Sequence, residues 1–284
     1  MTTLAPLPGV GQEPAAAGAV DDLAATALTG LESAVLTTVD GVRLIADLWH
    51  PAEPIGAAVV IAQGFTSTRW KPHMVRHVRA LTSLGYHVIS YDARGHGDSE
   101  GQCTLGHDES LDVAAAVEVA RLLAPHTVVV GSSMGAIAAL RYASLGGMAD
   151  GIVTVGGPAE WRLPRSVQGV AAAALTQTSV GRRIAARHLG VRLAAGFAQG
   201  PPPVELAAGL RIPLAVVHGA ADRVIPLGAS QLLHAAAGAP ACLEVVTGGG
   251  HSLSGIEPTV LGGAVGWTLD QLGVAAHVPA PRPA

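Results

Sequence analysis

Ser133 lies at the centre of a short pattern that would suit a catalytic nucleophile. In the stretch TVVVGSSMGAIAAL, Gly131 and Gly135 stand two residues before and two residues after it. The apolar residues before the pattern predict a strand, and the alanine-rich residues after it predict a helix. A sharp turn between the two would hold the serine in strained backbone geometry and present its hydroxyl group above the sheet edge. Ser133 is therefore the expected nucleophile for attack on a carbonyl carbon.

Asp222 and His251 are the residues expected to activate Ser133. A serine hydroxyl needs a base to take its proton, and the base needs a carboxylate to orient it. Asp222 follows the apolar run LAVVHG, and His251 follows the run LEVVTGGG. Seen alone, Asp222 would be interpreted as a turn residue and His251 as an ordinary loop histidine. Both, however, follow predicted strands in the chain order serine, acid, histidine that belongs to this turn.

Two backbone amides are expected to stabilise the oxyanion that forms during attack. One is the amide of Met134, directly after the nucleophile. The other is the amide of Phe65, in the loop that follows the apolar run VVIAQG. This pair would complete the site without a metal ion or an organic cofactor.

The rest of the chain predicts an α/β fold that positions these residues. Short apolar runs alternate with helical segments, which predicts a mostly parallel central sheet with helices on both faces. The stretch SAVLTTVDGVRLIADLWHP predicts a hairpin that turns at Asp40 and Gly41. Two patterns with other possible functions are interpreted as structural. The first is GHGDSEG, and Asp92 and Arg94, which lie just before it, should tie loops together. The second is His73 with His77, whose spacing could suit a metal ion.

The alternation predicts the domain organisation. Residues 29–157 and 208–275 are expected to form the α/β core, and residues 158–207 a small helical lid inserted between two of its strands. Residues 1–28 are rich in Ala, Pro and Gly and are expected to be a flexible N-terminal arm. Residues 276–284 are expected to be a flexible tail.

The lid is expected to contribute to substrate binding. Its apolar residues recur at roughly helical spacing, so one face of a helix would lie on the pocket. The candidate substrate-binding residues are Trp161, Val170, Ala174 and Phe197, although packing of the lid on itself would explain them as well. The arginines of the lid are interpreted as a solvated helix face, in preference to a site for an anionic substrate or membrane.

Composition excludes several functional classes. The 284 residues carry a net charge of −4, without the basic surface of a nucleic-acid-binding protein. The 2 cysteines do not suggest a disulfide framework, and no secretory signal is apparent, so a cytoplasmic location is expected. No long apolar run predicts a stable membrane insertion. The expected partner is a small acyl ester substrate, bound by a monomer or a homodimer.

Taken together, the motifs resemble those of the α/β-hydrolase superfamily. The resemblance is to its lysophospholipase/monoacylglycerol-lipase-like or serine-aminopeptidase-like branch, and it covers roughly residues 33–273. It rests on DGVRLIADLWHP, AQGFTSTRW, YDARGHGDSEG, GSSMG, HGAADRVIP and GGGHS. It implies the α/β-hydrolase fold, a Ser133–Asp222–His251 triad and an acyl-serine intermediate. Some members carry the acid after an earlier strand, which makes Glu160 the alternative to Asp222.

The sequence departs from the resemblance at Gln63, since this loop often reads His-Gly in the family and here reads Gln-Gly.

The expected function is a serine hydrolase that cleaves a carboxylic ester. The alternatives are a thioesterase, an amidase or peptidase, or a carbon–carbon hydrolase that uses the same triad. A non-catalytic ligand-binding protein on the same fold is the alternative from another class. Hydrolases with an aspartate nucleophile are disfavoured because the turn carries Ser133.

Overall fold

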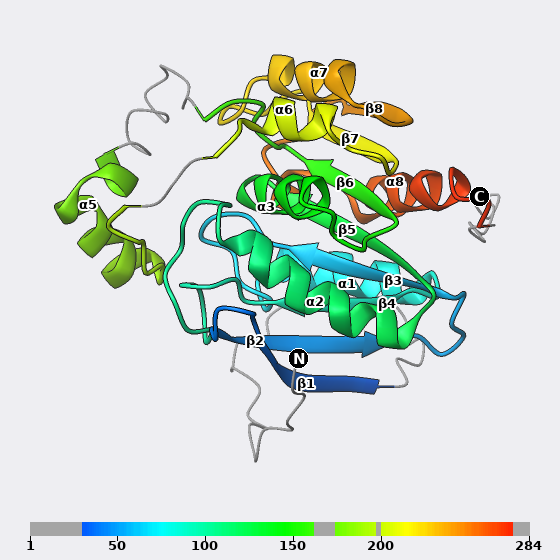
Figure 1. Ribbon diagram of the computed structural model, residues 1–284, viewed down its shortest axis with the longest axis horizontal. Coiled ribbons are helices and arrows are strands. Elements are labelled where there is room, and N and C mark those ends of the chain that lie inside the picture. Colours follow the sequence, from blue (N-terminus) through cyan, green and yellow to red (C-terminus); the bar gives the residue numbers. More distant parts are fainter. Residues whose placement is uncertain (1–29, 162–173, 197–199, 275–284) are drawn as a thin grey trace.

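In the part of the chain that the structure describes, the strands form one eight-stranded sheet at the centre of the protein (Figure 1). The computed structural model describes residues 30–161, 174–196 and 200–274. The strand order is β1-β2-β4-β3-β5-β6-β7-β8, with β1 and β2 antiparallel to their neighbours and all other pairs parallel. This confirms the predicted mostly parallel sheet. The strands are β1 (Gly30–Thr37), β2 (Arg43–His50), β3 (Ala57–Ala62), β4 (His87–Tyr91), β5 (His126–Ser132), β6 (Gly151–Val155), β7 (Leu214–Gly219) and β8 (Ala241–Val246).

Helices cover both faces of the sheet. Helices α2, α3, α6 and α7 pack side by side on one face, and α1 and α8 pack together on the other. The described helices are α1 (Pro72–Ser83), α2 (Glu109–Leu123), α3 (Met134–Ser144), α5 (Ser179–Ile184), α6 (Pro203–Ala208), α7 (Leu227–Ala236) and α8 (Pro258–Asp270). A π-helical turn (Ala185–Leu189) and a 3-10 turn (Leu253–Gly255) complete the set. None of these described helices combines the length and apolar character needed to span a membrane.

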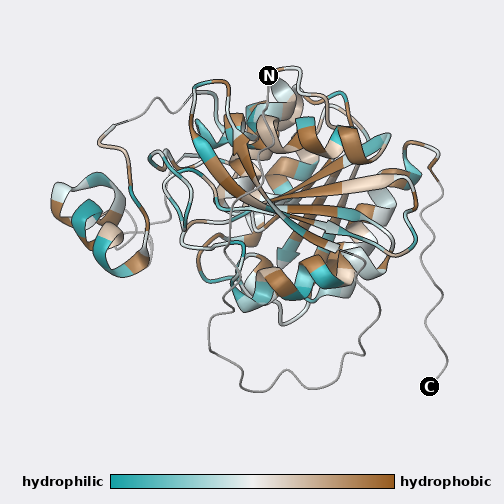
Figure 2. Cartoon of the chain, turned by 90° about the horizontal axis from the view of Figure 1, so that it is seen from below, coloured by the Kyte–Doolittle hydropathy of each residue, from teal (hydrophilic) through white to brown (hydrophobic). Residues whose placement is uncertain are grey.

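The central strands are apolar on both sides because both faces are covered. In β5, Val128 and Val130 pack with α1 and α8, while Val129 between them packs with α2 and α3. Successive residues of a strand point to opposite faces, so a continuous valine run fills both cores at once. Figure 2 shows these apolar strands running through the middle of the molecule.

The predicted hairpin is present at the edge of the sheet. Strands β1 and β2 pair in antiparallel register from Gly30 with His50 to Thr37 with Arg43. Gly41 has a φ of 85° and donates its amide to the carbonyl of Thr38 at 2.9 Å. A glycine adopts this left-handed geometry at little cost, which explains the turn at this position.

Ion pairs with buried members hold the loops around the sheet, as predicted for Asp92 and Arg94. Arg94 contacts Asp112 at 2.7 Å and Asp40 at 2.8 Å, and so links α2 to the β1–β2 turn. Asp92 pairs with Arg69, from the loop before α1. The Asp112 and Asp92 side chains are 0% and 1% exposed, so removing either arginine would leave a buried charge unpaired.

Between β6 and β7 the chain leaves the sheet for a long excursion. Its helix α5 and the π-helical turn after it extend away from the core (Figures 1 and 2). The chain then returns through Leu193, which pairs in parallel with Cys103 in the loop before α2. The expected N-terminal arm, the tail and residues 162–173 lie outside the described residues.

Candidate active site

Ser133 occupies the junction between β5 and α3 in a strained conformation. Strand β5 ends at Ser132 and α3 begins at Met134, so no loop separates them. The backbone of Ser133 has φ 51° and ψ −107°, a region that residues with side chains rarely adopt. Its amide donates to the carbonyl of Val155 in β6 at 2.9 Å. Strain of this kind persists only where neighbouring structure enforces it, and it is typical of functional sites.

The glycines that flank Ser133 allow this turn by close backbone approach. A Cβ on Gly131 would overlap the carbonyl oxygen of Gly135, and a Cβ on Gly135 would overlap the carbonyl oxygen of Ala62. Close backbone approach therefore explains why glycine occupies both positions. Small residues next in α3, including Ala136, Ala138 and Ala139, are fully buried against the sheet.

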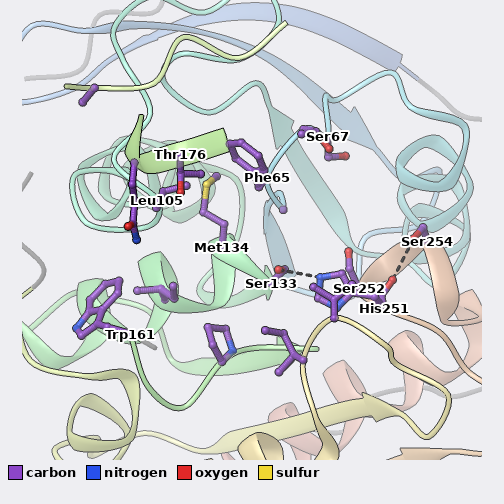
Figure 3. Close-up of a pocket in the computed structure, with 18 of the residues that line it drawn as sticks. Phe65, Ser67, Leu105, Ser133, Met134, Trp161, Thr176, His251, Ser252 and Ser254 are labelled. Atoms are coloured by element: carbon purple, nitrogen blue, oxygen red, sulfur yellow. Dashed lines mark hydrogen bonds between the residues drawn. The ribbon is translucent and has the colours of Figure 1, made fainter. Parts of the chain in front are cut away.

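His251 and Asp222 lie in hydrogen-bonding order beside Ser133. Figure 3 shows the contact between Ser133 and His251. His251 Nε2 is 3.0 Å from Ser133 Oγ, and His251 Nδ1 is 2.7 Å from Asp222 Oδ2. Asp222 follows β7 and His251 follows β8, so both side chains come from the carboxyl ends of neighbouring strands. This geometry suits a serine nucleophile, a histidine base and an orienting carboxylate.

The Asp222 carboxylate is buried but well supported by donors. Its other oxygen accepts the amides of Val224 at 2.7 Å and Ile225 at 2.9 Å. Burial raises the pKa of the Asp222 carboxyl, but the hydrogen bonds from His251 and from these amides outweigh it, so the pKa lies below its usual value. The carboxylate is therefore ionised at neutral pH and accepts from Nδ1–H. That arrangement leaves Nε2 of His251 free to accept a proton from Ser133.

Phe65 and Met134, whose amides are the expected oxyanion donors, line the same pocket as Ser133. Neither amide donates a hydrogen bond to any described residue. Met134 is the first residue of α3, where the helix dipole favours negative charge. Gly64 brings the other loop close, because a Cβ placed on it would stand 3.5 Å from Ser133 Cβ. The two amides are thus available to an oxyanion.

Gln63 and His96 hold the loop that carries Phe65. Gln63, 1% exposed, donates from Nε2 to the carbonyl of Ser67 at 2.7 Å and so spans the loop from within. His96 accepts the Thr66 amide at 3.4 Å and stacks edge-on against Phe65, with ring centroids 6.1 Å apart. The glutamine at the position that departs from the family pattern therefore supports the loop. The role of His96 had no signal in the sequence beyond its GHG motif.

Ser132 links the turn to the loop that carries His251. Its Oγ is 2.7 Å from Ser252 Oγ and accepts the amide of Leu253 at 3.2 Å. The sequence predicts Ser132 only as a small residue beside the nucleophile. Its partners lie more than one hundred positions away, so no local pattern marks this link.

A pocket of about 810 Å³ opens above Ser133 and His251. Trp161 lines it, with an indole Nε1 that donates to the carbonyl of Gly200 at 3.1 Å. Glu160 also lines the pocket, whereas the His251 Nδ1 partner is Asp222. The other lining residues include Phe65, Ser67, Leu105, Met134, Ile137, Thr176, Gln177, Ala194, Val224 and Ile225.

Three candidate pocket residues from the excursion have a different outcome. Val170 and Phe197 lie outside the described residues. Ala174 is exposed and does not line the pocket. Thr176 and Gln177, which follow in the same helical segment, line the pocket instead.

The histidine pair on α1 has protein partners. His73 Nε2 is 3.1 Å from Ser67 Oγ, and His77 Nδ1 is 2.7 Å from the carbonyl of His73. Over residues 30–161, 174–196 and 200–274, no three His, Cys, Asp or Glu side chains are grouped as a metal site would require.

Comparison with known proteins agrees with this fold. Residues 59–258 match the family described as the Alpha/beta hydrolase family. A monoacylglycerol lipase from Mycolicibacterium smegmatis is 31% identical over 228 residues, which cover 69% of this chain and 80% of the lipase.

Solved structures with the same fold include two esterases. An esterase from Pyrococcus furiosus has a TM-score of 0.65 at 22% identity, over 85% of this chain and 92% of its own. An esterase from Rhodococcus sp. ECU1013 has a TM-score of 0.59 at 20% identity, over 86% of this chain and 99% of its own. The fold and the family resemblance expected from the motifs are confirmed, and the chain belongs to the alpha/beta hydrolase family.

Proposed function

We propose that this protein hydrolyses carboxylic esters through an acyl-serine intermediate on Ser133. The observation that carries the proposal is the hydrogen-bonded series Ser133 Oγ, His251 and Asp222, with distances of 3.0 and 2.7 Å, at the base of a pocket. The monoacylglycerol lipase relative supports an ester as the substrate class. No cofactor is needed for this chemistry.

The groups of the site act in sequence during the reaction. Ser133 Oγ attacks the ester carbonyl while His251 Nε2 takes its proton, and Asp222 stabilises the imidazolium that results. The amides of Phe65 and Met134 donate to the oxyanion of the tetrahedral intermediate. His251 then gives the proton to the leaving alcohol. Water, activated by the same imidazole, releases the acid and restores Ser133.

We also propose that the excursion between β6 and β7 is a lid that shapes the pocket. Trp161, Thr176, Gln177 and Ala194 belong to it and line the space above Ser133. The lid would select among substrates and leave the chemistry to the core.

A cytoplasmic location stays a prediction, which the unpaired thiols of Cys103 and Cys242 support. The oligomeric state, monomer or homodimer, stays a prediction as well.

Thioester, amide and carbon–carbon hydrolysis remain alternatives because they use the same triad. A panel of matched substrates with one acyl group and four bond types would separate them. We expect the oxygen ester to have the highest kcat/KM. If another bond type is cleaved faster and the ester is inert, the substrate class proposed here is wrong.

A non-catalytic binding role is tested by a fluorophosphonate probe, which reacts only with an activated serine. We expect labelling of the native protein and none of Ser133→Ala. A folded native protein that stays unlabelled and hydrolyses no ester would support a ligand-binding function instead.

A further inference from the structure

A second histidine, His218, lies beside the carboxylate of Asp222. It belongs to β7, four positions before Asp222, and its side chain is fully buried. Its Nε2 is 3.9 Å from Asp222 Oδ2, the same oxygen that His251 Nδ1 contacts at 2.7 Å. Two histidines therefore share one carboxylate oxygen. His251 is the one that contacts Ser133, and the mechanism proposed above gives His218 no role.

The other ring nitrogen of His218 is held by a serine. Ser230 lies in α7 and is fully buried, and its Oγ is 2.8 Å from His218 Nδ1. Among the described residues, Ser230 makes no other side-chain hydrogen bond. Nε2 of His218 has no hydrogen-bond partner there. A polar atom buried without a partner is rare in proteins, so the surroundings of this nitrogen need an explanation.

The ring of His218 is neutral at pH 7. Burial lowers the pKa of its imidazole, and the attraction of Asp222 and the backbone of Ile225 offset this only in part. Asp222 and His251 are the titratable groups that act on the ring, and α7 contributes the uncharged hydroxyl of Ser230. A neutral imidazole carries one proton, on Nδ1 or on Nε2.

Counting donors and acceptors decides which nitrogen of His218 carries the proton. With the proton on Nδ1, the ring would donate to Ser230, whose own proton would have no acceptor among the described residues. The lone pair of Nε2 would then lie beside the negative charge of Asp222. With the proton on Nε2, Ser230 donates to Nδ1 and the Nε2–H group lies beside the carboxylate. The second arrangement satisfies the serine and replaces repulsion with attraction.

We propose that His218 is a positioning residue for the triad, in which Ser230 keeps the imidazole proton on Nε2 and that N–H group stabilises the Asp222 carboxylate. This inference rests on the proposed mechanism with Ser133, His251 and Asp222. At 3.9 Å the N–H group acts as a dipole, because the distance is too long for a full hydrogen bond. Its positive end lies near the carboxylate that balances the His251 imidazolium. His218 therefore opposes protonation of His251 and keeps it available as a base at lower pH.

The proton position on His218 can be observed directly in the native protein. Proton–nitrogen correlation spectra of protein with isotope-labelled histidine distinguish protonated from unprotonated ring nitrogens. The signals of His218 are those that disappear in His218→Gln. At pH 7 we expect a proton on Nε2 and none on Nδ1. A proton on Nδ1, or on both nitrogens, would overturn the proposal.

The pH profile of kcat/KM tests whether His218 acts through Asp222. His218→Phe removes the N–H group and keeps a ring, so the acid limb of the profile should move to higher pH by about half a pH unit. His218→Gln can still donate to Asp222, and its acid limb should stay close to that of the native protein. An unmoved limb in His218→Phe, or an equal displacement in both variants, would contradict this role. If His218→Phe does not fold, the proton position in the native protein still decides.

His77→Phe is the matched control. His77 is also fully buried with an unpartnered Nε2 among the described residues, but it lies in α1 and does not line the pocket. This variant should leave the acid limb in place. An equal displacement in His77→Phe would show general loosening of the core and would overturn the proposal. Fluorophosphonate labelling of Ser133 in the native protein tests the proposed hydrolysis separately, since the proton position of His218 is measured without turnover.

Discussion

At the scale of single residues, the proposed triad depends on a buried charge that the fold supplies with donors. Asp222 keeps its negative charge because His251 and two backbone amides donate to it, despite burial that opposes ionisation. The carboxylate then fixes which nitrogen of His251 carries the proton. The Glu160 alternative lacks this geometry, since the Nδ1 partner of His251 is Asp222.

Asp222→Asn should reduce kcat by a large factor, up to about 10⁴, because an amide can hold His251 in the wrong tautomer. Glu160→Gln is the matched control and should retain most of the activity. The measurement is steady-state hydrolysis of a p-nitrophenyl ester. If Glu160→Gln is inactive and Asp222→Asn turns over normally, the acid has been assigned to the wrong residue.

The same carboxylate should make stability depend on pH. The folded-state pKa of Asp222 is lowered, so its contribution to folding is present above its unfolded pKa and is lost as pH falls through the folded pKa. We expect Asp222→Asn to be less stable than the native protein at pH 7. The gap should narrow as pH falls below about 4, near the ordinary pKa of aspartate. Urea unfolding at several pH values measures this, and a gap of constant size from pH 7 to pH 3 would contradict it.

At the scale of elements, the turn between β5 and α3 depends on close backbone packing. Gly135→Ala would push a methyl group into the carbonyl of Ala62 in β3. We expect it to lower the free energy of unfolding by about 1–3 kcal/mol, the usual effect of overpacking, and to reduce kcat.

Gly263→Ala is the control for that substitution. Gly263 is exposed inside α8, and a Cβ there would meet nothing within 4 Å. Gly263→Ala should raise the free energy of unfolding by up to about 1 kcal/mol, because alanine has a higher helix propensity than glycine. Urea denaturation of both variants measures the difference, and equal effects would show that the turn is not tightly packed.

The pocket role of the proposed lid is tested by the same substitution, alanine to phenylalanine, at two of its positions. Ala194 lines the pocket, whereas Ala174 is exposed and outside it. Ala194→Phe should fill part of the pocket and shift the preference toward shorter acyl chains. Ala174→Phe should leave that preference as it is. Relative kcat/KM over p-nitrophenyl esters of graded length reports both, and identical profiles for the two variants would exclude a pocket role for this segment.

At the scale of the whole molecule, the sequence predicted the layers but not the links across them. Runs such as the valines of β5 follow directly from burial on both faces, and the chain order of Ser133, Asp222 and His251 placed them at one sheet edge. The position of β2 beside β4 had no such signal, because pairing partners are set by the whole sheet.

The links that hold the site together were also beyond the sequence. The contacts from Ser132 to Ser252 and from His96 to Thr66 join residues far apart in the chain, and ordinary serines and histidines make them. Ala174 illustrates the reverse case. Alanine-rich helical spacing predicted a helix, but it does not indicate which side of a short turn will face a pocket.

The central claim is an acyl-serine on Ser133, and trapping that intermediate tests it most directly. The protein is mixed with a p-nitrophenyl ester, quenched in acid during turnover and digested, and the peptides are weighed by mass spectrometry. We predict one acyl group on the peptide that contains Ser133, and none in Ser133→Ala. The acyl group should form at the same rate as the first equivalent of p-nitrophenol is released. Steady ester turnover with no acyl group on Ser133, or with the acyl group on another residue, would contradict it.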